Sequence, residues 1–164
     1  GHRCYIERMT DIRNSPELER AIQILTPREH SAQELRLKLV KRHIERDKIE
    51  AIIAYLIELD YLCDERFAEA YVAERTRKGD GPLKIRANLQ KRGVDRHLVE
   101  RFVTSDDEFW VEHAREVLSK RFAELESGQE RLPFSDWTKR RNLLMNRGFP
   151  ARVVGLSLGD FRRE

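Results

Sequence analysis

The sequence predicts an all-α protein built from three tandem three-helix repeats, stacked into an elongated array. Apolar residues recur at helical spacing, and no stretch shows the sustained alternation typical of strands. Arg42, Arg92 and Arg147 each close a middle helix, and they are spaced by 50 and then 55 residues. Charged residues make up 37% of the 164 residues and apolar residues 40%, a balance that favours an open helical body with a thin core.

The recurrence divides the chain into an N-terminal extension and three repeats. The extension covers residues 1–14, and the repeats cover 15–60, 61–104 and 105–164. Each repeat is too small to bury its own apolar face, so we expect it to pack on its neighbours. The handedness of the array, right or left, does not follow from the sequence.

The first repeat contains clear helix starts. Ser15 is a typical N-cap, followed by Pro16 at the first helical position. Ser31-Ala32-Gln33-Glu34 has the pattern of a capping box and opens the second helix. Isoleucines and leucines at helical spacing predict a third helix from about Asp47 to Leu59.

The second repeat is organised around the turn before its middle helix. Asp64 is expected to cap the first helix of this repeat. Gly79 and Gly81 permit backbone angles that other residues resist, and Pro82 suits the first position of the next helix. Gly93 is expected to end that helix in the left-handed conformation.

The third repeat begins with a second predicted capping box, Ser105-Asp106-Asp107-Glu108, ahead of a longer helix. Residues 126–132 form the most loop-like stretch of the chain. A further helix is expected from about Phe134 to Arg147, with Gly148 as its stop signal. Pro150 then starts the last helix.

Basic residues gather on the middle helices, although the net charge is only +3. Lys84, Asn88 and Lys91 follow one ridge of a helix whose apolar positions point inward. A run of charge is usually a solvated face, but recurrence of the pattern one repeat later favours a binding surface. The candidate partner-binding residues are Arg36, Arg75, Arg77, Lys78, Lys84, Arg86, Lys91, Arg92, Arg140, Arg141 and Arg147.

The sequence lacks the patterns of common catalytic and cofactor sites. The histidines have no metal-ligand spacing and are expected to be surface or partly packed residues. The acidic residues after Ser105 fit helix capping better than metal binding, and the turn at Gly79 lacks the Walker pattern. Cys4 and Cys63 are expected to be reduced thiols, and no apolar run is long enough to cross a bilayer. We therefore expect no enzyme, cofactor, metal site or membrane association.

The stretch from Tyr61 to Ala68, followed by Lys78-Gly79 and Gly81-Pro82, resembles the RecX family, small regulators of the RecA recombinase. The similarity runs from about Ala21 to Phe161. Further matching positions are Ser31, Glu34, Leu35, Leu39, Tyr71, Arg75, Ile85, Leu89, Gly93-Val94 and Arg147-Gly148-Phe149. The chain departs from the family pattern at Asp60, Cys63 and Asp80, where glycine, aspartate and an aromatic residue are common.

This resemblance implies three tandem three-helix repeats that form a curved rod. It also implies a cytoplasmic regulator of DNA repair and homologous recombination that lies in the groove of the RecA–DNA filament. There it would restrain the ATPase, strand-exchange and coprotease activities of RecA.

Two other functions fit the residues. The first is a DNA-binding module that contacts the phosphates of single- or double-stranded DNA through its basic patches without reading bases. The scarcity of aromatic residues within the basic stretch argues against this function. The second is a helical scaffold with no connection to DNA.

Overall fold

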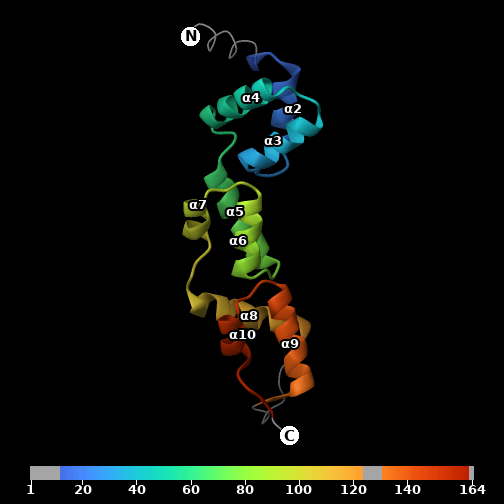
Figure 1. Ribbon diagram of the computed structural model, residues 1–164, viewed down its shortest axis with the longest axis vertical. Helices are drawn as coiled ribbons and strands as arrows, with labels where there is room; N and C mark the ends of the chain where they lie inside the picture. The colour runs from blue at the N-terminus through green and yellow to red at the C-terminus, as the bar shows by residue number, and fades with distance from the viewer. Residues whose placement is uncertain (1–11, 124–130, 163–164) are drawn as a thin grey trace. The chain divides into compact units, whose positions relative to one another are not determined.

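The computed structural model describes residues 12–123 and 131–162, and within these ranges the fold is mostly helical (Figure 1). The helices are α2 (Pro16–Leu25), α3 (Ala32–Lys41), α4 (Arg46–Glu58), α5 (Asp64–Arg77), α6 (Pro82–Lys91), α7 (Arg96–Phe102), α8 (Asp107–Arg121), α9 (Phe134–Asn146) and α10 (Ala151–Leu158). The predicted helical class is confirmed. One addition is a short parallel pair between β1 (Leu132–Pro133) and β2 (Phe161–Arg162), which the sequence does not predict.

The chain folds as two compact units. Unit 1 comprises the described part of Gly1–Ala70 together with Gln90–Leu98, and unit 2 comprises Tyr71–Leu89 with the described part of Val99–Glu164. The chain passes from one unit to the other within α5, α6 and α7. The repeat boundaries at 15–60, 61–104 and 105–164 come from sequence recurrence and remain a prediction. Most of the N-terminal extension and of the loop-like stretch 126–132 lies outside the described residues.

The first three helices form as the sequence predicts (Figure 1). The Ser15 side chain accepts a hydrogen bond from Leu18 N, and Pro16 is the first helical residue. Both halves of the capping box between Ser31 and Glu34 are present at the start of α3. Helix α4 begins at Arg46, one residue before the expected start.

The core of unit 1 lies among α2, α3 and α4, whose apolar faces point at one another. Because α3 packs on both α2 and α4, a single cluster is formed. The buried members of this cluster are Ile12, Leu18, Ala21, Leu35, Leu39, Ile49, Ile52, Ile53, Leu56 and Leu62.

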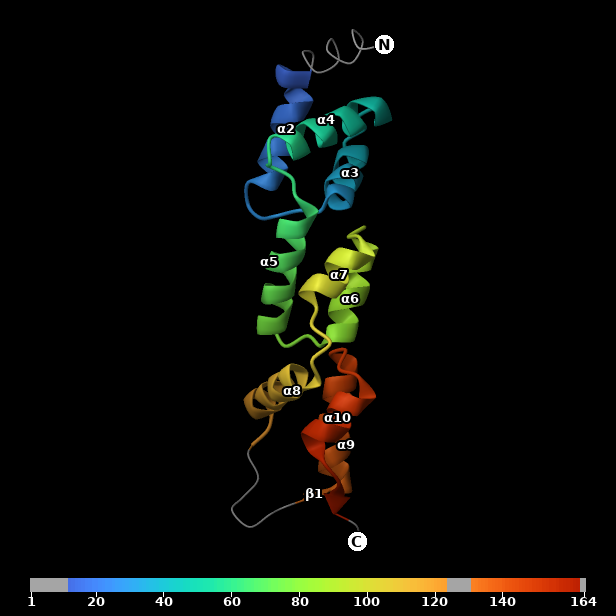
Figure 2. The ribbon, with the colours of Figure 1, turned by 90° about the vertical axis from the view of Figure 1, so that its left-hand side faces the viewer.

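The core of unit 2 is more aromatic and lies where α8, α9 and α10 meet (Figure 2). Trp110 is 2% exposed and its indole meets the ring of Phe149 at a centroid distance of 6.4 Å, in an edge-on arrangement. The Trp110 Nε1 group donates to the carbonyl of Thr104 at 2.7 Å, so its polar atom is satisfied. Leu144, Val153 and other aliphatic side chains fill the remaining space.

Two predicted helix starts are wrong. The cap of α8 is Asp106, whose side chain accepts from Glu108 N, so the expected box from Ser105 does not form. The reason is that Glu108 N, the amide that a box from Ser105 would use, donates to Asp106 Oδ1 at 3.1 Å instead. Asp64 is itself the first residue of α5, and its carboxylate accepts from Ala32 N at 2.8 Å.

Within unit 1, the turn after α6 docks on the start of α3. Gly93 has φ +77°, as expected for a helix-ending glycine. The Ser31 hydroxyl donates to the carbonyl of Arg92 at 2.8 Å, which places Gly93 against Gln33. A Cβ atom at residue 93 would lie 2.7 Å from Gln33 Cβ, so this position requires glycine for space as well as for conformation.

Within unit 2, the turn after α9 docks in the same way on the start of α6. Gly81 N donates to Arg147 O at 2.7 Å, and Leu83 N donates to Gly148 O at 2.9 Å. Gly79 has φ +95° as predicted, but Gly81 does not have a positive φ. Gly81 is needed because a Cβ atom there would lie 2.5 Å from the carbonyl carbon of Gly148.

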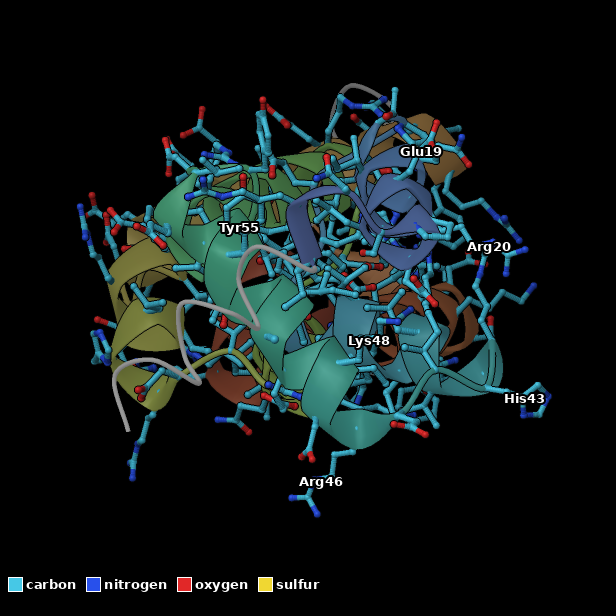
Figure 3. All side chains as sticks on the ribbon, turned by 90° about the horizontal axis from the view of Figure 1, so that it is seen from above. Glu19, Arg20, His43, Arg46, Lys48 and Tyr55 are labelled. Atoms are coloured by element: carbon cyan, nitrogen blue, oxygen red, sulfur yellow. The ribbon has the colours of Figure 1, made fainter. Side chains whose placement is uncertain are left out.

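The corresponding turn of the first repeat, after α3, is exposed. His43 takes the left-handed conformation there, with φ +62°, where the later repeats have glycine. Figure 3 shows His43 and Arg46 extending away from the ribbon, with Arg20 and Lys48 also on this end of unit 1. Arg20, Arg46 and Lys48 were not among the predicted binding residues.

Candidate functional site

The predicted binding residues fall in both units. Arg36, Lys91 and Arg92 belong to unit 1, and the other eight belong to unit 2. Whether each residue can bind a partner depends on the exposure of its side chain and on the contacts that the side chain already makes inside its own unit.

In unit 1 two of the three cations are already paired. Arg36 Nε lies 2.6 Å from Glu50 Oε1, and this hydrogen bond raises the pKa of Arg36 and lowers that of Glu50. Arg92 Nε lies 3.6 Å from Glu34 Oε2, the same carboxylate that completes the cap of α3. Lys91 is exposed and forms no ion pair with other described residues.

Arg75 is held by Asp80, one of the three positions that depart from the family pattern. The Asp80 side chain is fully buried, and its Oδ2 atom lies 2.6 Å from Arg75 Nε. This hydrogen bond raises the pKa of Arg75. A buried carboxylate needs a close cation, so Arg75 stabilises the turn and a partner would have to compete with Asp80 for it.

Lys84 and Arg86 are also engaged. Lys84 Nζ lies 3.5 Å from the second oxygen of Asp80. Arg86 donates through Nη2 toward the carbonyls of Val103 and Thr104, at 3.4 and 3.5 Å. Reversal of charge at Arg86 would place a carboxylate against two carbonyl oxygens, so Arg86 also has a structural function.

Arg140 and Arg141 lie side by side in sequence but have different surroundings. The guanidinium of Arg140 lies 4.4 Å from the centroid of the Phe122 ring and donates to the carbonyl of Ala123. Arg141 is exposed, and its hydrogen bond within the described residues is a weak one to Asn142 Oδ1 at 3.5 Å. Of this pair, Arg141 is the better placed to contact a partner.

Arg77, Lys78 and Arg147 line one pocket of unit 2, which we call the α8 pocket, with a cavity volume of about 690 Å³. Arg147 donates to the carbonyl of Lys78 at 3.2 Å, which draws the end of α9 toward the end of α5. Two further cations from the last turn of α8, Lys120 and Arg121, line the same pocket. Sequence analysis missed both, although two adjacent cations end this helix.

Two aromatic side chains of α8 complete the pocket. Phe109 is 44% exposed, and its ring lies roughly parallel to that of His113, at 25° and a centroid distance of 6.5 Å. His113 is 9% exposed, contrary to the expectation of a surface or partly packed histidine. Burial lowers the pKa of His113, so the imidazole is neutral at pH 7.

Neither a metal-ligand cluster nor a membrane-spanning helix is found among the described residues. They contain no group of three or more His, Cys, Asp or Glu side chains that could hold a metal ion. No helix in the described ranges has both the length and the apolar character needed to cross a bilayer. Cys63 is a half-buried free thiol, and Cys4 lies outside the described residues.

The fold and the cationic surfaces therefore define a helical binding protein made of three-helix units. Residues 18–56 match the family described as "RecX, first three-helix domain", and residues 64–101 match "RecX, second three-helix domain". The chain belongs to the RecX family of regulatory proteins, which are not enzymes.

Comparisons with whole proteins agree with this assignment. The chain is 38% identical over 137 residues to the regulatory protein RecX of Xanthomonas axonopodis pv. citri, covering 84% of this chain and 82% of that protein. It is 36% identical over 144 residues to the RecX protein of Salmonella paratyphi A, covering 80% of this chain and 83% of that protein.

Two crystal structures share the fold. That of RecX from Lactobacillus salivarius aligns with a TM-score of 0.68 and 24% identity, covering 93% of this chain and 95% of that one. A second structure, of regulatory protein RecX, aligns with a TM-score of 0.71 and 20% identity, covering 85% of this chain and 70% of that one.

Proposed function

We propose that this protein acts in the cytoplasm, where it binds the filament that RecA forms on DNA, lies in its groove, and restrains its ATPase, strand-exchange and coprotease activities. The observation that carries the proposal is the similarity to RecX proteins over 84% of the chain. The structure adds exposed cations that are available to a partner.

A protein that binds a filament at several separate contact sites needs only weak affinity at each of them. Unit 1 carries the exposed Lys91, and unit 2 carries the exposed Arg77 and Arg141, none of which forms an ion pair with other described residues. Two contact sites on one polymer multiply their affinities, because the second contact forms at high effective concentration. We propose these three cations as direct contacts, and the other eight predicted residues as supporting ones.

The test is inhibition of the single-strand-dependent ATPase of RecA by a variant with two reversed charges, Arg77→Glu/Arg141→Glu. Exposed charges contribute little to folding, so the variant should melt like the wild type. Half-inhibition should require roughly tenfold more protein, with a weaker dependence on salt, because such charges act through steering and pairing.

The matched control is Arg20→Glu/Arg46→Glu, which changes the net charge by the same amount on exposed positions outside the proposed surface. It should inhibit like the wild type. Equal inhibition by all three proteins would show that Arg77 and Arg141 belong to a solvated face. No inhibition by the wild type would refute the proposed function itself.

A second function, direct contact with DNA, is favoured by one observation. The scarcity of aromatic residues within the basic stretch argued against it, but the fold brings Phe109 into the same pocket as Arg77 and Lys78.

A further inference from the structure

The α8 pocket combines cations from three parts of the chain. Arg77 and Lys78 come from the end of α5, Lys120 and Arg121 from the end of α8, and Arg147 from the end of α9. Only Lys78 among them has an ion pair with other described residues, at 2.9 Å to Glu74. The helix macrodipole explains why a cation stands at the C-terminal end of each of these three helices. It does not explain why the three ends meet at one cavity.

Phe109 gives this pocket a flat apolar wall. Its ring packs edge-on against the buried Trp110 at a centroid distance of 4.9 Å, while 44% of the residue remains exposed. Trp110 and His113 pack against the ring from the side of the core, and the rest of the Phe109 surface is open to solvent.

The pocket also contains hydrogen-bonding groups that an anion alone would not use. Glu112 and Glu116 line it beside the cations. His113 lines it too, and its imidazole is almost fully buried.

We propose that the α8 pocket binds a nucleotide of single-stranded DNA, with the base stacked on Phe109 and the phosphates held by the surrounding cations. Base stacking on an aromatic side chain and phosphate pairing with Arg and Lys are the two interactions that bind single strands without sequence preference. Carboxylates accept from the amino groups of bases, which gives Glu112 and Glu116 a function.

The lining distinguishes this ligand from two others. An acidic peptide would pair with the cations, but it has no need of a stacking platform. A DNA duplex presents phosphates, but its bases are stacked on one another and their faces cannot reach Phe109. A cavity of about 690 Å³ is within the range of about 300–1,000 Å³ for small-molecule sites.

The experiment measures binding of the full chain to a fluorescein-labelled dT oligonucleotide by anisotropy, without RecA, at several salt concentrations. Phe109→Ala should weaken binding roughly five- to 150-fold, since stacking on an aromatic ring contributes about that much per base. Phe109→Tyr should restore it, because the tyrosine ring keeps the platform. Phe134→Ala, which removes an aromatic side chain 57% exposed outside the pocket, should have no effect.

The cations are tested in a second pair of variants on α8. Arg121→Ser should reduce the slope of log affinity against log salt by about 0.7, the value for one phosphate of a single strand. Arg115→Ser, an exposed arginine of the same helix outside the pocket, should leave the slope unchanged.

Three results would overturn the proposal: unchanged affinity in Phe109→Ala, equal affinity for a duplex of the same length, or polyglutamate binding that is as tight and equally sensitive to Phe109→Ala. The last result would identify the pocket as a site for an acidic peptide. Because RecA is absent from this assay, its outcome is independent of the proposed filament regulation. A chain that binds the oligonucleotide but leaves RecA uninhibited would refute only the latter.

Discussion

Gly81 is the position at which a single methyl group should do the most damage to unit 2. A Cβ atom there would lie 2.5 Å from the carbonyl carbon of Gly148, 2.6 Å from its oxygen and 2.6 Å from Phe149 N. All three are backbone atoms, so no side chain can move aside. Carbon atoms in contact stand about 3.5–4.0 Å apart, and the two turns must therefore separate by about 1 Å in Gly81→Ala.

That separation sets the magnitude. The hydrogen bonds from Gly81 N to Arg147 O and from Leu83 N to Gly148 O, now 2.7 and 2.9 Å, would be stretched beyond bonding range. Their loss costs about 0.5–1.5 kcal/mol each, and overpacking adds about 1–3 kcal/mol. Alanine also lowers the conformational entropy of the unfolded chain, which offsets this loss by about 0.4–1 kcal/mol. The net loss of stability is about 1–6 kcal/mol.

The assay is thermal unfolding followed by tryptophan fluorescence. Both tryptophans of the chain, Trp110 and Trp137, belong to unit 2, so the signal reports on the unit that contains the substitution. A loss of this size should lower the midpoint by roughly 2–24 °C.

The control is Gly155→Ala in α10 of the same unit. A Cβ atom at residue 155 would meet no atom within 4 Å, so alanine should leave stability unchanged or raise it by up to about 1 kcal/mol. If Gly81→Ala has the same unfolding midpoint as Gly155→Ala, the contact between the two turns is looser than the structure shows and the reasoning is refuted.

Two other predictions concern unit 1. Gly93→Val should destabilise unit 1 by more than about 1 kcal/mol. A β-branched residue resists φ +77°, and its Cβ atom would lie 2.7 Å from Gln33 Cβ. An unchanged midpoint of urea unfolding, followed by circular dichroism, would count against this. Stability should also fall between pH 7.5 and 5.5, because burial lowers the pKa of His30 in the folded chain. As the pH falls through 6.5, the usual histidine pKa, the unfolded chain takes up a proton at residue 30 that the folded chain does not, and this favours unfolding. In urea titrations this loss should shrink in His30→Gln, and an equal pH dependence of variant and wild type would contradict the assignment.

The sequence by itself determined the helical class and most helix ends. Caps such as Ser15 and Ser31, and the helix-ending conformation of Gly93, depend on interactions within four residues, which a local pattern records. The exceptions have tertiary causes or local competition. Asp64 accepts a hydrogen bond from Ala32 N in α3, and Asp106 accepts from Glu108 N, the amide that a cap at Ser105 would use.

Only the tertiary structure decided which cations are available and what stands beside them. Arg75 and Lys84 look as exposed in sequence as Arg77, but both lie beside the buried carboxylate of Asp80, whose burial results from packing rather than from its neighbours in sequence. Likewise, Phe109 is some thirty residues from Arg77 along the chain, and no periodicity places them in one pocket. Charge and helical phase are local properties, whereas pairing and convergence depend on how distant helix ends meet.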